Sequence, residues 1–435
     1  MRLFVLSLVC AILGAGVAQA VLFDPHSVHS GALPNGLRVI VEEDRGSPVV
    51  AVEVVVKVGV ADESPDQGGS AHLLEHVLWG AGGEHDPRAE IEAVGGVTNA
   101  GTLRDFTHFY ATLPAGQLGL AVQALARVVL QDELDDEVVN RERQVILEEA
   151  AVRGDEPRAR LNDLAFATVY GEAHPYGRRL EGSGDSLAGI DAVRLGVFRR
   201  AWYVPNNMAV VIVGDVGFDG AMEAVGAAFG HLAPEPVPSR TWAEAPRPAR
   251  RGGAVIGTAR SETYVMAAFV GPAFSEPTEV CATDVLTVLL SNVTFRRLKN
   301  SLLETGPLAQ ASGVDYLTQR DRGLVGVWAI CGPANVEEAQ GAIRRELARL
   351  AGEPVSPKEL TIAKRLTLAA YSFANETASD RASTLAFYEA LGNYREAFQY
   401  PQRVRSLTAA DIRNVAGWYA GDPVWIVLAA REGEK

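Results

Sequence analysis

Two hydrophobic periods run along this chain and divide it into segments typical of strands and segments typical of helices. Residues 39–43 and 49–60 carry apolar and β-branched residues in the runs of half-buried and buried strands. Residues 208–215 form another such run, and residues 97–113 indicate a strand pair with a break near Arg104. The helical period is found at residues 117–131, 136–152, 161–170, 195–202 and 218–232.

A stretch without either period, residues 234–252, follows this first half. It contains five prolines and ends in an Arg-Arg-Gly sequence, which predicts a linker between domains. The second half repeats the plan loosely, with expected strands at 253–258, 264–270, 325–330 and 424–428 and helices at 277–291, 295–304, 336–350 and 357–374. We therefore expect an α+β protein of two homologous α/β domains in tandem, residues 21–233 and 253–435, each with a sheet covered on one side by helices.

The first twenty residues have a different character. Arg2 precedes an apolar run over residues 3–17, and Ala18-Gln19-Ala20 matches a small-residue cleavage site. This pattern predicts a secretory signal peptide at residues 1–20, which is too short for a membrane span. Later segments do not approach the roughly twenty uninterrupted apolar residues of a spanning helix. We expect an exported protein, periplasmic in a Gram-negative source.

Charge and cysteine content narrow the function classes. Asp and Glu number 54 against 40 Lys and Arg, and the formal net charge is −14. This acidic balance argues against a surface for nucleic acid, where clusters of Lys and Arg are expected. Only Cys281 and Cys331 remain after the leader. A disulfide between them and a pair of buried thiols both stay open.

Residues 67–80 concentrate the candidate chemistry, because they contain His72, Glu75 and His76 in the pattern His-x-x-Glu-His. On a helix, residues four apart lie on the same face, so the two imidazoles can point at one zinc ion. Glu75 leans toward that face and can hold or deprotonate an attacking water, as in peptidases with the reversed order His-Glu-x-x-His. For the pattern alone, a partly buried helix that happens to carry two histidines is the alternative.

A catalytic zinc usually has three protein ligands, so a third one is needed. The acidic segment 140–150 offers Glu142, Glu148 and Glu149. Glu142, Ile146 and Glu149 fall at i, i+4 and i+7 on one helical stripe, and this spacing favours Glu149 over Glu148 for a site that faces inward. The other reading of this segment is a solvated acidic face.

Together these motifs resemble the pitrilysin/insulinase family of zinc peptidases, most closely the branch with mitochondrial processing peptidase and small bacterial homologues. The resemblance covers nearly the whole chain after the leader. Its residues are His72-Leu-Leu-Glu-His76, Gly95-Gly-Val-Thr-Asn-Ala-Gly-Thr102, Asp105-Phe-Thr107, Glu142-Arg-Gln-Val-Ile-Leu-Glu-Glu149, His174-Pro-Tyr-Gly177, Tyr203-Val-Pro-Asn206 and Val213-Gly-Asp215.

The resemblance implies roles for individual residues. His72, His76 and Glu149 would be the zinc ligands, and Glu75 would be the catalytic base. Glu142 matches an acidic position that supports the site. The strand with Asn99 and Ala100 would lie beside the zinc and take up substrate as an added strand, which gives affinity with little sequence selectivity. An ordinary core strand is the alternative for Asn99 and Ala100. The chain as a whole would form half of a clamshell.

One segment departs from the family pattern. Active single-subunit relatives carry an Arg and a Tyr seven residues apart in the second domain, and residues 297–310 of this chain align with that segment but place Leu303 and Gln310 there. Those two groups position the substrate and polarise its carbonyl. We therefore expect a zinc endopeptidase subunit for unfolded peptides that forms a heterodimer with a homologous subunit carrying Arg and Tyr. The alternative is a catalytically silent subunit that binds zinc and peptides or acts as a scaffold.

Overall fold

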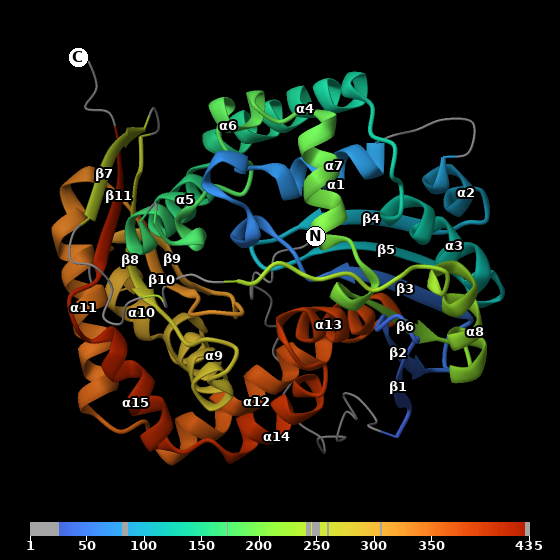
Figure 1. The fold of residues 1–435 in the computed structure, drawn as a ribbon. Coiled ribbons are helices and arrows are strands. Elements are labelled where there is room, and N and C mark those ends of the chain that lie inside the picture. Colours follow the sequence, from blue (N-terminus) through green and yellow to red (C-terminus); the bar gives the residue numbers. More distant parts are fainter. Residues whose placement is uncertain are drawn as a thin grey trace.

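The computed structural model describes residues 26–80, 86–171, 173–240, 245, 253–258, 261–304 and 307–430. The expected signal peptide, residues 1–20, and much of the expected linker lie outside these residues. Two mixed sheets covered by helices make up the fold, one in each half of the chain (Figure 1). This is the α+β architecture of two α/β units that the sequence predicts. Within the described ranges, no helix combines the length and the apolar character needed to cross a membrane.

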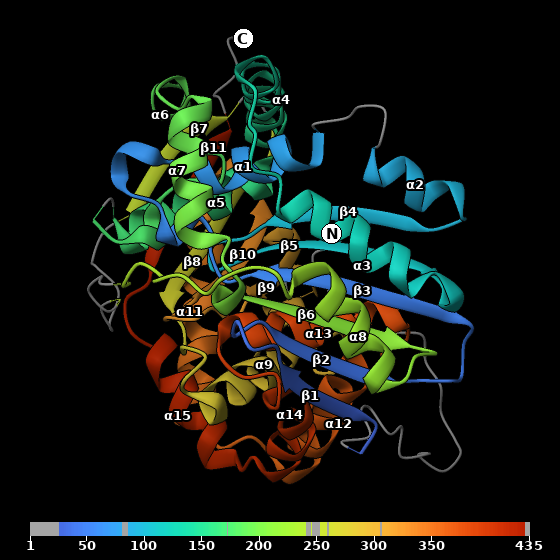
Figure 2. The ribbon, with the colours of Figure 1, turned by 45° about the vertical axis from the view of Figure 1, so that its right-hand side comes forward.

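The first sheet has the strand order β1-β2-β6-β3-β5-β4 (Figure 2). Only β2 and β6 run parallel within it, and every other neighbouring pair is antiparallel. β4 is an edge strand, so one side of its backbone does not pair with another strand of the sheet. The six strands are β1 (Val28–Ala32), β2 (Arg38–Glu43), β3 (Val49–Val56), β4 (Val97–Thr102), β5 (Thr107–Pro114) and β6 (Met208–Gly214).

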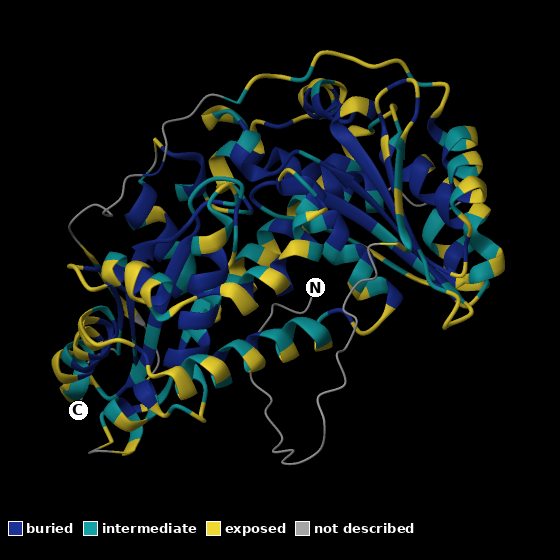
Figure 3. Ribbon diagram, turned by 90° about the horizontal axis from the view of Figure 1, so that it is seen from below, coloured by how far each residue is buried: buried dark blue, intermediate teal, exposed yellow. Residues whose placement is uncertain are grey.

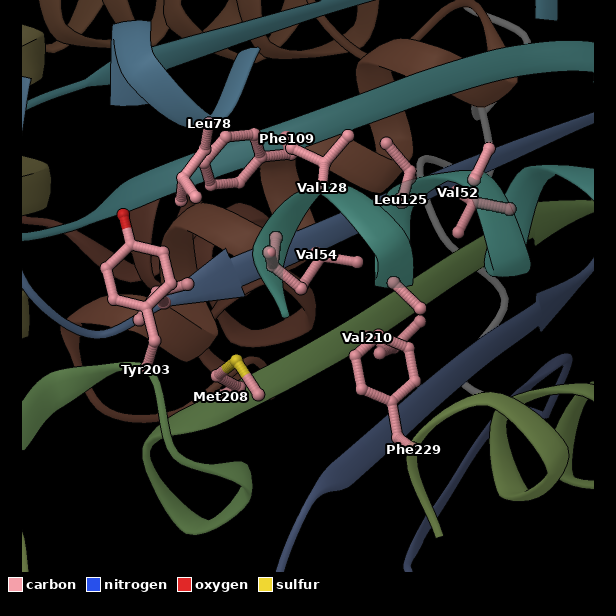
Figure 4. Packing of buried hydrophobic residues seen from close by; sticks show 14 of the residues in the cluster. Val52, Val54, Leu78, Phe109, Leu125, Val128, Tyr203, Met208, Val210 and Phe229 are labelled. Atoms are coloured by element: carbon pink, nitrogen blue, oxygen red, sulfur yellow. The ribbon is translucent and has the colours of Figure 1, made fainter. Parts of the chain in front are cut away.

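One face of this sheet carries a large apolar core beneath the helices of the first half. Figure 4 shows part of it, where Val52, Val54 and Val210 from the strands meet Leu78 of α1 and Val128 of α3. This burial fixes α1 to the sheet. The helices of this half are α1 (Ser70–Gly80), α2 (Pro87–Ala93), α3 (Leu118–Val129), α4 (Asp136–Asp155), α5 (Pro157–Tyr170), α6 (Gly184–Ala188), α7 (Ala192–Trp202) and α8 (Phe218–Phe229).

The second sheet has the order β7-β11-β8-β10-β9. Its only parallel pair is β7 with β11, so it repeats the order and directions of the first sheet without β1. This shared topology is what a duplication produces, and it makes β9 the counterpart of β4. The strands are β7 (Gly253–Thr258), β8 (Thr263–Val270), β9 (Ala309–Tyr316), β10 (Leu324–Cys331) and β11 (Val424–Ala430).

Helices of the second half pack on this sheet and continue beyond it. A short π-helical turn, Asn300–Glu304, follows α10 where the sequence predicts one helix over 295–304. Cys281 and Cys331 are both buried free thiols. The helices are α9 (Pro277–Ser291), α10 (Arg297–Lys299), α11 (Val336–Gly352), α12 (Pro357–Phe373), α13 (Ala378–Leu391), α14 (Glu396–Ser406) and α15 (Ala409–Tyr419).

The two halves exchange helices, which the sequence does not predict. α13 of the second half covers the other face of the first sheet, and α5 of the first half covers the corresponding face of the second sheet. The expectation that helices cover each sheet on one side only is therefore wrong, because a helix from the other half covers the second face of each sheet. The central strands are buried on both faces as a result (Figure 3).

Candidate metal centre

The helix α1 that carries the histidine motif is fixed at its beginning by a glycine and a carboxylate. Gly69 has φ +93°, and a Cβ there would lie 2.8 Å from the Glu181 carbonyl oxygen, so a side chain does not fit. The Glu63 carboxylate accepts hydrogen bonds from the backbone N–H groups of Gly69 and Ala71 at 2.9 and 2.8 Å. These contacts satisfy donors at the helix start and set where the helix begins.

The two histidines and the glutamate of the motif lie on one face of α1. The ring centroids of His72 and His76 are 4.7 Å apart. One side-chain donor atom from each of His72, Glu75 and His76 lies within 4.8 Å of the others. The opposite face of the helix carries Leu73, Leu74, Val77 and Leu78, which are buried in the core, so the helix cannot rotate this cluster away.

Helix α4 brings two carboxylates to this cluster. Glu149 Oε2 lies 3.8 Å from His72 Nε2 and 3.6 Å from His76 Nε2. Glu142, two turns earlier, places Oε2 3.5 Å from His76 Nδ1, and Arg141 donates to its Oε1 at 3.0 Å. The stripe of Glu142, Ile146 and Glu149 therefore faces α1 as its spacing predicts, and Ile146 between the two acids is fully buried.

Burial gives the groups of α1 different ionisation behaviour. It lowers the pKa of His72 to about 3, so this imidazole is neutral and keeps a lone pair for a metal. Burial also raises the pKa of Glu75, which is 6% exposed, above its ordinary value. Thr102 of β4 donates to Glu75 Oε2 at 3.2 Å and opposes that rise. A carboxyl tuned in this direction suits proton transfer near neutral pH.

The donor set fits zinc. Tetrahedral zinc with bonds of about 2.0–2.1 Å needs ligand atoms roughly 3.3 Å apart, and the two contacts between Glu149 and the histidines are only slightly longer. Two imidazole nitrogens with one carboxylate are also the ligand types that zinc takes in hydrolytic sites. His72 Nδ1 is buried and makes no hydrogen bond with the described residues.

The cluster lies in the wall of a cavity of about 940 Å³ between α1, α4 and β4. The exposed Asn99, together with Ala100 and Gly101 of β4, lines this cavity beside the motif residues. The edge strand thus runs past the cluster, with Thr102 at its end beside Glu75. An extended peptide can pair with β4 there and reach the histidines.

The two departures from the family pattern lie in the second half, on the π-helical turn Asn300–Glu304 and on β9. Leu303 belongs to the π-helical turn and packs against the apolar core of the second half. Gln310 is exposed on the edge strand β9. Arg297, which begins the aligned segment, is buried and donates to Glu359 at 2.9 Å.

Two residues of the site were not assigned a role from the sequence. Glu63 holds the beginning of α1, and Thr102 holds Glu75. Thr102 belongs to the motif around the β4 strand, but its contact with Glu75 depends on how α1 packs on β4. Glu63 precedes the helix by seven residues, which is beyond the spacing of a local cap.

A cluster of two histidines and a glutamate on one helix, faced by an acidic helix inside a duplicated α+β fold, is typical of the centre of a zinc metallopeptidase. Comparison with known families is consistent with this class. Residues 38–183 match the family described as insulinase (peptidase family M16), and residues 190–367 match the peptidase M16 inactive domain. The chain belongs to the M16 or insulinase family of peptidases.

Several of its relatives are named as zinc proteases. An uncharacterized zinc protease of Mycobacterium leprae is 30% identical over 395 residues, which cover 88% of this chain and 87% of the relative. The zinc protease PqqE of Helicobacter pylori is 28% identical over 96% of this chain and 95% of its own. A solved protease from Helicobacter pylori has the same fold, with a TM-score of 0.85 and 24% identity over 93% of this chain and 99% of that one. Zinc is therefore the cofactor that the family implies, and the donor set accommodates it.

Proposed function

We propose that this chain is the zinc-binding subunit of an endopeptidase that hydrolyses unfolded peptides. His72, His76 and Glu149 hold the metal, and Glu75 is the catalytic base. The observation that carries this proposal is the contact of Glu149 Oε2 with the Nε2 atoms of both histidines. Glu142 supports the site by holding His76 through Nδ1, which leaves Nε2 for the metal.

The chemistry divides between the metal and the chain. Zinc supplies a Lewis acid that polarises the scissile carbonyl and makes water acidic. Glu75 takes a proton from the attacking water and passes it to the leaving amine, and the raised pKa of its carboxyl favours this exchange. Thr102 keeps the Glu75 carboxylate in place through its hydrogen bond.

The substrate is proposed to be an extended peptide that pairs with β4. Asn99 and Ala100 would contact its main chain, because both line the cavity on the edge strand. Main-chain pairing requires an unfolded segment, and a folded protein does not present one to an edge inside a cavity. We propose a periplasmic location for this activity, on the basis of the leader pattern that the sequence predicts at residues 1–20.

A homologous partner subunit is proposed to complete the site. Leu303 and Gln310 occur where active single-subunit relatives have Arg and Tyr, and leucine cannot polarise a carbonyl. A relative from Arabidopsis thaliana, 28% identical over 76% of this chain and 64% of its own length, is named as a probable subunit of mitochondrial processing peptidase. A partner that carries the Arg and Tyr pair would supply the missing groups in a heterodimer.

The same two residues favour a second candidate function. In it the chain binds zinc and peptides without cleaving them, or serves as a scaffold subunit. Turnover of a quenched fluorescent peptide distinguishes the two functions. The peptide is incubated with the chain alone and with the chain plus a paralogue that carries Arg and Tyr. The peptidase proposal expects negligible turnover alone and zinc-dependent turnover in the mixture. Absence of turnover in the zinc-loaded mixture would favour the silent subunit.

Replacing Glu75 by Gln tests the base directly. We expect Glu75→Gln to lower kcat of the active mixture by at least about 100-fold, because the amide cannot take a proton. The zinc content should stay that of the wild type, since Glu75 is not a proposed ligand. Full turnover by Glu75→Gln would contradict the assignment, and the zinc content measured on the same sample shows whether the site is intact.

A further inference from the structure

His108 on β5 has one ring nitrogen without a hydrogen-bond partner among the residues that the structure describes. The residue is 5% exposed, and its Nδ1 lies 2.7 Å from Glu53 Oε1. The other oxygen of Glu53 accepts a hydrogen bond of 2.7 Å from Ser383 of α13. His108 Nε2 is buried and makes no hydrogen bond with any described residue. A buried ring nitrogen without a hydrogen bond costs free energy, unless a group from outside the chain binds it.

The unpartnered nitrogen points to the edge of the sheet. His108 pairs with Gly101 of β4, and a Cβ on Gly101 would lie 2.9 Å from Nε2. The imidazole therefore extends across the position where β4 has no side chain. Gly101 and His108 lie on the face of the sheet opposite to α1, because their neighbours Thr102 and Phe109 point toward that helix.

The proposed substrate would pair with this same edge strand, β4. Gly101 lines the cavity, Asn99 is exposed, and Tyr110 is partly exposed and stacks on the His108 ring at 5.6 Å. Side chains of a peptide strand alternate between the two faces. A side chain of an added strand that points to the face opposite α1 would lie beside Gly101, where β4 has no side chain of its own against the His108 ring.

We propose that His108 is a specificity residue, whose Nε2 accepts a hydrogen bond from a substrate side chain beside Gly101. Nδ1 lies 2.7 Å from the Glu53 carboxylate, and in the tautomer in which Nδ1 donates to Glu53 the lone pair of the ring is on Nε2. The side chain that fits is a hydrogen-bond donor, with the hydroxyl of Ser or Thr as the smallest case. This inference rests on the proposed function, since it uses the same pairing of peptide with β4.

Fluorescence anisotropy with matched peptides tests this subsite. A host peptide of uniform Ala-rich sequence and a series with a single Ser at each position are bound to the zinc-loaded chain carrying Glu75→Gln, which does not cut them. One position should show tighter binding of the Ser peptide by about fivefold, the value of one hydrogen bond.

Three variants show whether this preference comes from His108. Glu53→Gln with His108→Leu removes the nitrogen without leaving a buried carboxylate unpaired, and Glu53→Gln alone is its control. Gly101→Ala places a methyl group against Nε2 and blocks it from the added strand. The Ser preference is the ratio of the affinity for the Ser peptide to the affinity for the Ala host peptide. This ratio should fall to about one in the double variant and in Gly101→Ala, and it should stay at the wild-type value in the Glu53→Gln control.

The outcomes separate this inference from the proposed function. A Ser preference that is equal in the double variant and in the control overturns the role of His108, even if the wild-type mixture cleaves peptides. A preference that depends on His108 without any Glu75-dependent cleavage supports the subsite and overturns the hydrolysis. Failure of every peptide to bind the zinc-loaded chain overturns both.

Discussion

Two glutamates beside the same histidines have contrasting surroundings. Glu75 is buried and bonded to Thr102, whereas the side chain of Glu149 is 51% exposed and contacts both Nε2 atoms. A ligand carboxylate must stay ionised, which solvent favours, and a base gains from the raised pKa that burial gives. The surroundings of the two residues thus support separate roles for them.

A buried acid far from this site gives a pH-dependent prediction. Burial raises the pKa of Asp284 on α9 from 3.8 to about 7, against a hydrogen bond of 2.8 Å from Tyr400. The folded protein holds the Asp284 proton more tightly than the unfolded chain does. The contribution of Asp284 to the free energy of unfolding is therefore full below pH 4, and it is lost as the pH rises through 7. Asp284→Asn keeps an acceptor for Tyr400, so we expect it to stabilise the protein by on the order of 2 kcal/mol at pH 8.

Denaturant unfolding of both proteins at pH 4.5 and pH 8 checks this prediction. The increase in the free energy of unfolding caused by Asp284→Asn should be small at pH 4.5 and reach its full size above pH 7. An equal difference between Asp284→Asn and the wild type at both pH values would show that the carboxyl does not change its protonation on folding.

The residues of the proposed metal centre could be predicted from the sequence because their spacing is local. His72, Glu75 and His76 share one helix, and a period of 3.6 residues selects Glu149 over Glu148 on another. The partners Glu63, Thr102 and His108 could not be assigned in this way. Glu63 lies beyond the spacing of a local cap. Thr102 contacts Glu75 only because α1 packs on β4, and His108 contacts Glu53 only because β5 pairs with β3.

At the scale of elements, the first turn of α1 determines where the proposed metal ligands lie. The Glu63 carboxylate satisfies two backbone donors at this end, and the cluster begins at His72, directly after them. A shift or fraying of this first turn would move His72 relative to Glu149. The position of the proposed metal ligands therefore depends on a residue outside the helix.

Glu63→Gln should destabilise the fold by about 1–2 kcal/mol and weaken zinc binding, because the amide can accept only one of the two N–H groups. Asp66→Asn, an exposed acid just before the same helix, is the matched control. Thermal unfolding and a competitive zinc titration of the two variants measure both effects. Equal behaviour of the two variants in both assays would contradict the role given to Glu63.

Element prediction succeeded where large apolar residues mark a period and failed where small residues do the packing. The strand β3 and helix α9 are close to their expected ranges. α13 was not predicted, because its buried face consists largely of alanines, which give a weak hydrophobic signal. These alanines let the helix approach the sheet closely, and they are Ala378, Ala382, Ala386 and Ala390. The strand β9 was missed for a similar reason, since Gly, Ser and Gln interrupt its alternation.

At the scale of the whole molecule, the exchange of α5 and α13 makes the halves depend on each other. Each sheet has one face covered by a helix from the other half. Ion pairs strengthen both contacts, with Arg381 of α13 bound to Glu42 and Arg158 of α5 bound to Asp315. Neither half can bury both faces of its sheet alone, although the sequence predicts two separate domains.

This exchange predicts that the halves unfold together. Calorimetry should show one transition, because loss of α13 exposes the first sheet and loss of α5 exposes the second. Leu385→Ala, in the fully buried face of α13, should lower the stability of that single transition by about 2–4 kcal/mol. Two resolved transitions, with only the first-half one shifted by Leu385→Ala, would show that the halves are independent.

The central claim is that Glu149 joins His72 and His76 around one zinc ion, and the zinc content of purified protein tests it most directly. Elemental analysis of the wild type, Glu149→Gln and Glu148→Gln compares the proposed ligand with its immediate neighbour on α4. We predict about one zinc per chain in the wild type and in Glu148→Gln, and a large loss in Glu149→Gln. Full zinc occupancy and unchanged affinity in Glu149→Gln, or loss in Glu148→Gln instead, would contradict the account.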